Sequence, residues 1–282
     1  MGEKILYKYL DAEGGAGMLF NHNLMFTNAT QLNDPFECHQ RLIDYSKAPS
    51  DVIGPWDQKT IEGLEVNRAE RLRDKTWICS LSKVYNSLLM WTFYAKNHQG
   101  ICIGIDMDKA KKYLDRMLGL FVGCPEIEVQ YKSIVEKPDG FRDKIDFFTY
   151  QLGTKAKEWE YEKEVRLVAV DPSPIHMRLL KKEQKNQCCM VVCEKICKAI
   201  SAVTNVFKNN TDNIVLQDWR EVHAFADLGG ECFDSLYLGK DIVDYKRKKI
   251  IEFAKNLNPN IKIYQMTIDP EAFRLKGQLI EE

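Results

Sequence analysis

The segment on which the interpretation of this chain depends is residues 158–170, EWEYEKEVRLVAV. It begins with charged residues and ends in an apolar, β-branched run that is typical of a buried strand. Glu160, Glu162, Glu164 and Arg166 fall at every second position, so a continuous strand would place all four on one face. Two interpretations follow: an edge strand with a solvated charged face, or a strand whose first carboxylates line a pocket.

The composition is that of a globular protein without a strong overall charge. The 282 residues include 40 basic and 41 acidic side chains, and 45% are hydrophobic. A net charge of −1 provides no general attraction to nucleic acid or to a membrane surface. The first residues lack the apolar region of a signal peptide, and no run reaches the roughly 18 apolar residues of a membrane span. We therefore expect a cytoplasmic protein with no membrane partner.

Nine cysteines, an odd number without a secretory signal, indicate reduced thiols. Four of them cluster at Cys188, Cys189, Cys193 and Cys197. The last three are spaced four residues apart, which places them on one side of a helix among apolar residues. Zinc sites usually take their ligands from separate turns, so small core residues explain this cluster better than a metal does. We expect no metal site.

The expected elements alternate irregularly between strands and helices. Strands are expected at residues 5–10, 24–27, 77–82, 101–106, 127–132, the end of 158–170, 235–239 and 261–268. Helices are expected at 61–75, 88–98, 108–118, 140–159 and 243–256, with 185–207 helical or mixed and 11–20 a loop or a weak helix start. No phosphate-cradling glycine motif occurs. The predicted class is α+β, with a mixed β-sheet core and flanking helices.

No linker is clear enough to divide the chain, and no internal repeat is present. We expect a single domain over residues 1–282, with a core over 1–170 and a C-terminal extension over 171–282 that packs on it.

Two short segments carry candidate site residues. In NDPFE, residues 33–37, an aspartate before proline favours a tight turn. Either this turn only locks a loop, or Asn33, Asp34 or Glu37 lines a pocket.

The second segment joins the expected strand at 77–82 to the helix that follows it. Ser80 and Ser82 end the strand, and Asn86 or Ser87 caps the helix. Hydroxyls that converge with helix N-terminal amides can bind a ribose or a phosphate, although ordinary capping explains the same residues equally well.

Taken together, NDPFE, WICSLS…NSLLMWTFYAKNHQGICIGID and WEYEKEVRL resemble a widespread bacterial family of unknown function. The shared motifs are a Y-x-Y strand, the N-D-P-F-[ED] loop, L-M-W-x-x-Y-A-x-x-H-x-G and Y-E-x-E-x-R. The resemblance covers residues 5–170 and becomes looser toward the C-terminus. It implies no activity.

The order of elements also resembles the ADP-ribosyltransferase fold of poly-ADP-ribose polymerases and DNA-modifying toxins. Those proteins have a first strand with His or Arg, a Ser-bearing strand that leads into a helix with an aromatic residue, and a strand that begins with the catalytic Glu. The matching positions here are Tyr7, Lys8 and Tyr9, then Ser80, Ser82, Asn86, Trp91 and Tyr94, then Glu164 with Glu162. The sequence departs from the pattern in having no His or Arg on the first strand, where Lys8 is the nearest substitute.

This second resemblance implies NAD as the substrate and no metal. Glu164 would hydrogen-bond the ribose 2′-hydroxyl and stabilise the cation that develops as the nicotinamide–ribose bond breaks. Glu162 would orient or deprotonate the incoming nucleophile. Ser80 or Ser82 would hold Glu164 or the ribose. Lys8 would contact the ribose or the pyrophosphate.

An aromatic side chain, Trp91 or Tyr94, would stack on the nicotinamide. The expected function is the transfer of ADP-ribose to a macromolecular acceptor, either protein or nucleic acid. Its setting would be a toxin or an antiviral defence effector, with an antitoxin as a candidate partner.

The alternative is a non-enzymatic module on the same fold that binds nucleic acid or protein. The basic run DYKRKK at 244–249 favours this alternative, although a solvated helix face explains the run as well. A metal-dependent hydrolase is a third interpretation, for which the sequence offers no convincing ligands.

Overall fold

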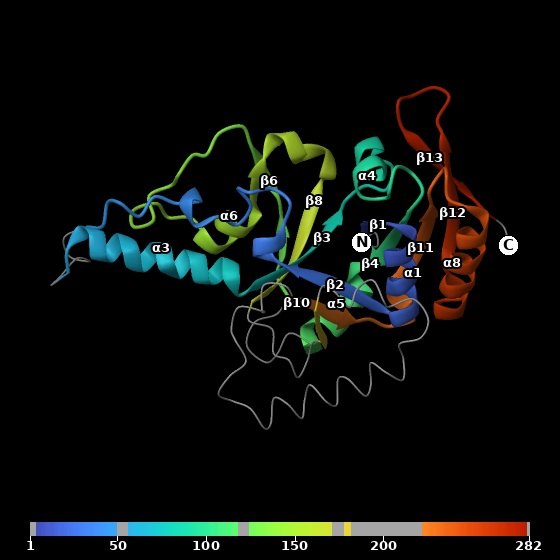
Figure 1. Cartoon of the computed structure of the whole chain (residues 1–282), viewed down its shortest axis with the longest axis horizontal. Helices are drawn as coiled ribbons and strands as arrows, with labels where there is room; N and C mark the ends of the chain where they lie inside the picture. Colours follow the sequence, from blue (N-terminus) through green and yellow to red (C-terminus); the bar gives the residue numbers. More distant parts are fainter. Residues whose placement is uncertain (1–3, 50–55, 118–123, 171–177, 182–221, 281–282) are drawn as a thin grey trace.

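The computed structural model describes residues 4–49, 56–117, 124–170, 178–181 and 222–280. Helices surround a mixed sheet, as the predicted α+β class requires (Figure 1). The cysteine cluster at 188–197 and the expected element at 185–207 lie outside the described residues. No helix in the described part of the chain is long and apolar enough to cross a membrane.

Eleven described strands form one sheet, whose main path runs β13-β12-β11-β4-β1-β3-β2-β10-β9, with β8 and β5 branching from β3. In chain order the strands are β1 (Ile5–Leu10), β2 (Asn23–Asn28), β3 (Thr76–Ser82), β4 (Ile101–Asp106), β5 (Glu126–Glu128), β8 (Glu164–Val170), β9 (Arg178–Lys181), β10 (Val222–Asp227), β11 (Phe233–Leu238), β12 (Lys262–Ile268) and β13 (Leu275–Leu279). Only β11 and β12 pair in parallel within this sheet. A second, two-stranded sheet joins β6 (Gln130–Lys132) to β7 (Thr154–Ala156).

The alternation of side chains along β4 defines two apolar layers. Ile101, Ile103 and Ile105 pack in the larger core cluster, against residues of α1 (Ala12–Asn21), α5 (Met107–Met117) and α8 (Asp244–Leu257). Cys102 points the opposite way, into a smaller cluster that includes Trp91 of α4 (Leu88–Phe93). The period of two therefore buries both faces of this strand.

The C-terminal strands continue the same sheet, because β11 pairs with β4 over most of its length. In Figure 1, α1 and α8 lie side by side at this end of the molecule. Phe20 of α1 contacts Phe253 of α8, with ring centroids 5.6 Å apart. At the opposite end, α3 (Gln58–Asp74) extends away from the sheet, and α6 (Phe147–Gly153) lies nearby (Figure 1).

One edge of β3 is shared by two different strands. Trp77 and Ile78 pair with β2, whereas at the other end Ser82 pairs with Tyr7 of β1. The opposite edge pairs continuously with β8. In the described structure, no strand pairs with the shared edge between Ile78 and Ser82, so the sheet opens there.

The opening segment of the sequence does not form one continuous strand. Residues Lys157–Glu162 form a 3₁₀ helix, η3, which ends at Lys163 in a left-handed conformation (φ 46°). Strand β8 begins only at Glu164, so the prediction that Glu160, Glu162, Glu164 and Arg166 share one strand face is wrong. The edge-strand interpretation is also wrong, because β8 pairs with both β3 and β5 and is buried over Glu164–Ala169.

Helix α4 is shorter than the helix expected at 88–98. Ser87 caps its N-terminus, but it ends at Phe93, because Lys96, Asn97 and His98 all have positive φ.

Three further predictions need correction. Residues 127–132 divide between β5 and β6, which belong to different sheets, and only Phe147–Gly153 of 140–159 is α-helical. Residues 11–20 form most of a capped helix, α1, in which the Asp11 side chain accepts a hydrogen bond from the Gly14 amide.

We expect Leu236→Ala to lower the free energy of unfolding by about 2–5 kcal/mol, because Leu236 is fully buried where β11 meets β4. Leu279→Ala is the matched control, since Leu279 is 53% exposed and its loss should cost no more than about 0.5 kcal/mol. Urea denaturation measures both. Equal losses for the two variants would contradict the central position of β11.

Candidate active site

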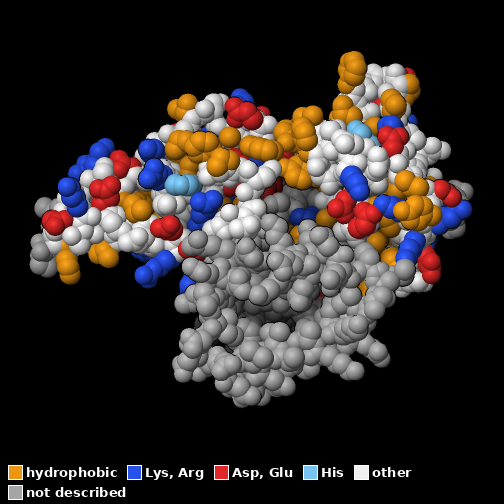
Figure 2. Space-filling view, in the orientation of Figure 1, with side chains coloured by type: hydrophobic (Ala, Val, Ile, Leu, Met, Phe, Trp, Pro, Cys, Tyr) orange, Lys and Arg blue, Asp and Glu red, His pale blue; other side chains and the backbone are white. Residues whose placement is uncertain are grey.

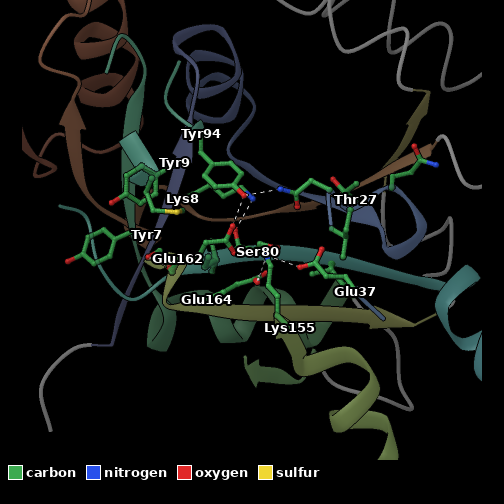
Figure 3. Close-up of a pocket in the computed structure, with 17 residues that line it drawn as sticks. Tyr7, Lys8, Tyr9, Thr27, Glu37, Ser80, Tyr94, Lys155, Glu162 and Glu164 are labelled. Carbon is green, nitrogen blue, oxygen red and sulfur yellow. Dashed lines mark hydrogen bonds and ion pairs between the residues drawn. The ribbon is translucent and has the colours of Figure 1, made fainter. Parts of the chain in front are cut away.

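A cavity of about 280 Å³ opens where β1 and β2 separate along the edge of β3 (Figure 3). Its lining comes from both strands, from the NDPFE loop, from α4 and from η3 and β8. The lining includes Tyr7, Lys8, Tyr9, Asn33, Glu37, Ser80, Ser82, Tyr94, Lys155, Glu162 and Glu164. Segments far apart in the sequence thus meet at the split in the sheet.

Behind the cavity lies a fully buried arginine, Arg166 of β8. Its Nε and Nη2 donate to the two oxygens of Glu164, at 3.0 and 3.1 Å. Nη2 also contacts Glu37 of the NDPFE loop, and Nη1 donates to the Leu152 carbonyl at 2.6 Å. One guanidinium therefore ties together β8, the NDPFE loop and the end of α6.

Lys155 of β7 is the second buried cation of the site. Its Nζ lies 2.8 Å from Glu37, 2.5 Å from Glu162 and 3.3 Å from Glu164. Because the last two oxygens contact one nitrogen, they lie no more than about 6 Å apart, and Figure 3 shows the carboxylates converging on this amine. Burial alone would lower the pKa of Lys155, but Glu164, Glu37 and Glu162 raise it, so the amine stays charged.

The environments of Glu162 and Glu164 shift their pKa values in opposite directions. Burial would raise the pKa of Glu164, but Arg166, Lys155 and a hydrogen bond from Ser80 lower it to about 2. For Glu162, burial outweighs the attraction of Lys155 and the hydrogen bond from Tyr94, and its pKa is raised. Such a divergence is typical of a carboxylate pair in which one member stays ionised and the other exchanges a proton.

The mouth of the cavity carries a short chain of hydrogen bonds. The exposed Asn33 side chain donates to the Tyr94 hydroxyl at 3.1 Å, and this hydroxyl donates to Glu162 at 2.5 Å (Figure 3). Burial is the main cause that raises the pKa of Tyr94, with Glu162 adding to it, so the phenol stays protonated. The chain runs from the surface to the buried carboxylates.

Lys8 bridges the split between the strands, and Ser82 links β3 to the end of η3. The Lys8 amine donates to the Ser80 carbonyl at 2.9 Å, across the gap where β1 and β3 do not pair. The Ser82 hydroxyl donates to the Glu162 carbonyl at 2.6 Å, which holds the end of η3 against β3. Lys8 and both serines line the cavity, and so do Tyr7 and Tyr9.

Two residues expected in the site lie elsewhere. Trp91 is fully buried, its indole donates to the Tyr85 carbonyl and its ring packs against Tyr9, so it cannot stack on a ligand in the cavity. Asn86 does not line the cavity, and it is Ser87 that caps α4. Of the two aromatic residues that were expected to stack on a ligand, Trp91 and Tyr94, only Tyr94 lines the cavity.

The NDPFE loop combines both of the roles considered for it. Asp34 accepts a hydrogen bond from the Phe36 amide at 2.9 Å, which locks the turn. The same turn directs Asn33 and Glu37 to the cavity. Among the described residues, the second oxygen of Glu37 has no hydrogen-bond partner.

Lys155 is the site residue that the sequence did not reveal. It follows α6 on a three-residue strand, and nothing in TKAKEWE separates it from the exposed Lys157. The alternating series includes Arg166 but does not distinguish it as a residue of the site. The one available signal was that Arg166 lies within the apolar run of β8, where a charge requires partners.

The described residues contain no group of three or more His, Cys, Asp or Glu side chains that could hold a metal ion. The carboxylates that converge at the cavity form ion pairs with Lys155 and Arg166. With two cations and three carboxylates in contact, the cluster favours a ligand that carries or develops positive charge.

Comparisons with known proteins give one match. A family model described as a protein of unknown function (DUF2971) matches residues 90–167, which run from α4 into β8 and include Tyr94, Lys155, Glu162, Glu164 and Arg166. This is a shorter stretch than the expected 5–170. No curated protein and no solved structure matches the chain.

We expect Arg166→Met to lower the free energy of unfolding by about 3–5 kcal/mol, because it leaves Glu37 and Glu164 buried with one cation fewer. Arg68→Met, at a side chain that is 82% exposed, should change it by no more than about 0.5 kcal/mol. Adding Glu164→Gln to Arg166→Met should recover part of the loss. Chemical denaturation tests all three, and a fully additive double variant would argue against the network.

Acid should remove the contribution of Glu164 to stability. Its folded-state pKa of about 2 lies below the unfolded value of roughly 4.3, so ionised Glu164 stabilises the fold above that pH, by on the order of 3 kcal/mol. This contribution is lost as the pH falls toward 2. The pKa of Glu162 is raised, so protonation of Glu162 in acid favours the folded state and opposes the effect of Glu164. The difference in unfolding free energy between the wild type and Glu164→Gln should therefore shrink from pH 5 to pH 2. A constant difference would contradict the lowered pKa.

Proposed function

We propose that this pocket binds NAD, breaks its nicotinamide–ribose bond and transfers ADP-ribose to a macromolecular acceptor. The observation that supports this proposal is the pair Glu162 and Glu164, whose oxygens share the Lys155 amine and whose pKa values diverge. Cleavage of an N-glycosidic bond passes through an oxocarbenium-like transition state, which an ionised carboxylate stabilises. Glu164 would supply that charge and accept a hydrogen bond from the ribose 2′-hydroxyl.

The remaining lining suits the reacting end of the dinucleotide. A cavity of about 280 Å³ lies near the lower limit of small-ligand pockets, roughly 300–1,000 Å³, so it would take the nicotinamide riboside and leave the adenosine outside. Tyr7, Tyr9 and Tyr94 provide aromatic walls for the nicotinamide. Lys8, held at the split by the Ser80 carbonyl, would meet the ribose or the pyrophosphate.

The arrangement of these elements supports an ADP-ribosyltransferase-like fold as part of the proposal. A first strand with Lys8, a Ser-bearing strand that leads into a helix and a strand that begins with Glu164 meet at one cavity. On this analogy the protein would act in the cytoplasm as a toxin or an antiviral defence effector, restrained by an antitoxin.

Exposed aromatic residues near the mouth support a macromolecular acceptor. Phe36 in the NDPFE turn is 60% exposed, and Phe93, next to Tyr94, is 63% exposed. Figure 2 shows hydrophobic side chains gathered along the upper edge of this face, over β6 and η3. Exposed apolar groups beside a reactive site are typical of a surface that receives another protein or nucleic acid.

The second candidate is a non-enzymatic module that binds nucleic acid or protein, favoured by the basic run of α8. Lys246 of this run pairs with Glu13, and Lys248 pairs with Asp244. The run is therefore less basic than its sequence indicates. Retention of nucleic acid without any binding of NAD would favour this candidate.

We expect Glu164→Gln to reduce nicotinamide release from NAD by at least about 10²–10³-fold, because it removes the charge that stabilises the developing cation. Glu160→Gln is the matched control: Glu160 is only four residues away, exposed on η3, and should leave the rate unchanged. Released nicotinamide is measured by chromatography, and circular dichroism verifies that both variants fold. Wild-type protein that neither binds nor consumes NAD would refute the proposal.

A further inference from the structure

The Tyr94 hydroxyl occupies the position between the cavity mouth and Glu162. It accepts a hydrogen bond from Asn33 at 3.1 Å and donates one to Glu162 Oε1 at 2.5 Å. Exposure falls along this chain: Asn33 is exposed, Tyr94 is half-buried and Glu162 is 4% exposed. Figure 3 shows Tyr94 above Glu162, with the two side chains joined at the phenol oxygen.

Both oxygens of Glu162 already have partners. Oε1 accepts from Tyr94, and Oε2 accepts from Lys155 at 2.5 Å. The backbone carbonyl of the same residue is held by Ser82, which fixes the end of η3. Tyr94 and Glu162 both line the cavity, and a nucleophile that donates to the Tyr94 hydroxyl is connected through it to Glu162 Oε1.

We infer that Tyr94 is a catalytic residue that relays the proton of the incoming nucleophile to Glu162. This inference rests on the proposed NAD cleavage and adds the route by which the nucleophile is activated. The phenol oxygen lies in the cavity wall, where an attacking hydroxyl or water can donate to it. Glu162 is the final proton acceptor, and Tyr94 keeps a proton before and after the step.

The step balances without any further reactant. The nucleophile oxygen forms a bond to the ribose C1′, and the C1′–nitrogen bond breaks with its electron pair retained by nicotinamide. The proton of the nucleophile moves to the Tyr94 oxygen while the Tyr94 proton moves to Glu162 Oε1. The products are the ADP-ribosylated acceptor, neutral nicotinamide and a protonated Glu162.

The electrostatics of the two residues agree with these roles. Burial raises the pKa of Glu162, so its carboxylate holds a proton more readily than an exposed glutamate does. The pKa of Tyr94 is also raised, so a free phenolate does not form and the transfer is concerted. Glu164, with a pKa of about 2, does not compete for the proton and keeps its negative charge near the developing cation.

The test compares a nucleophile that must lose a proton with one that carries none. Water is the first and the azide anion the second, and nicotinamide release from saturating NAD is the measurement. Tyr94→Phe should lower kcat with water by about 10²–10⁴-fold, the range for general acid–base catalysis, with KM for NAD unchanged. With azide, the variant and the wild type should react at similar rates. Tyr161→Phe, at a nearby tyrosine that does not line the cavity, should match the wild type with both nucleophiles.

Glu162→Gln is the second variant and keeps the inference testable if Tyr94→Phe does not fold. Glutamine can accept the Tyr94 hydrogen bond but not the proton, so we expect the same loss with water and the same retention with azide. Equal losses with water and azide would overturn the relay, because a nucleophile that carries no proton would then depend on Tyr94 as well. Wild-type kinetics in Tyr94→Phe would also overturn it, while leaving the proposed NAD cleavage intact. A wild-type protein that releases no nicotinamide with either nucleophile would overturn both.

Discussion

The buried guanidinium of Arg166 is the interaction on which the rest of the site depends. An arginine without access to water requires partners for most of its donors, and here they come from Glu164, Glu37 and the Leu152 carbonyl. Glu37 lies 129 residues before Arg166 in the sequence, whereas the other two partners are local. Because a buried charge without partners is strongly destabilising, the need to pair Arg166 fixes how the NDPFE loop, α6 and β8 pack together.

The second constraint is that one edge of β3 serves two strands. Because β2 pairs with its beginning and β1 with its end, the middle of this edge remains open to side chains. Lys8 extends across the gap and binds the Ser80 carbonyl, which replaces a missing ladder hydrogen bond. The cavity is therefore a consequence of strand pairing, and its position does not depend on a flexible loop.

Much of the sheet could be predicted because its strands have strong local patterns. ILYKYL is a strand at its expected bounds, and the continuous apolar runs of β3 and β4 indicate burial on both faces. The predictions were wrong where one backbone conformation interrupts an otherwise regular pattern, as at Lys163 and at Lys96–His98. Lys155 could not be assigned because its role comes from three carboxylates that only the tertiary fold brings to it.

The left-handed turn at Lys163 determines how the two carboxylates relate to each other. On a continuous strand, Glu162 and Glu164 would point in parallel, about two residue rises apart. Because η3 ends at this turn, the two side chains instead approach one amine from different elements. Their spacing thus depends on the main-chain conformation of one residue, and a one-residue insertion or deletion at this junction would separate the two carboxylates although the sequence would still contain every residue of the site.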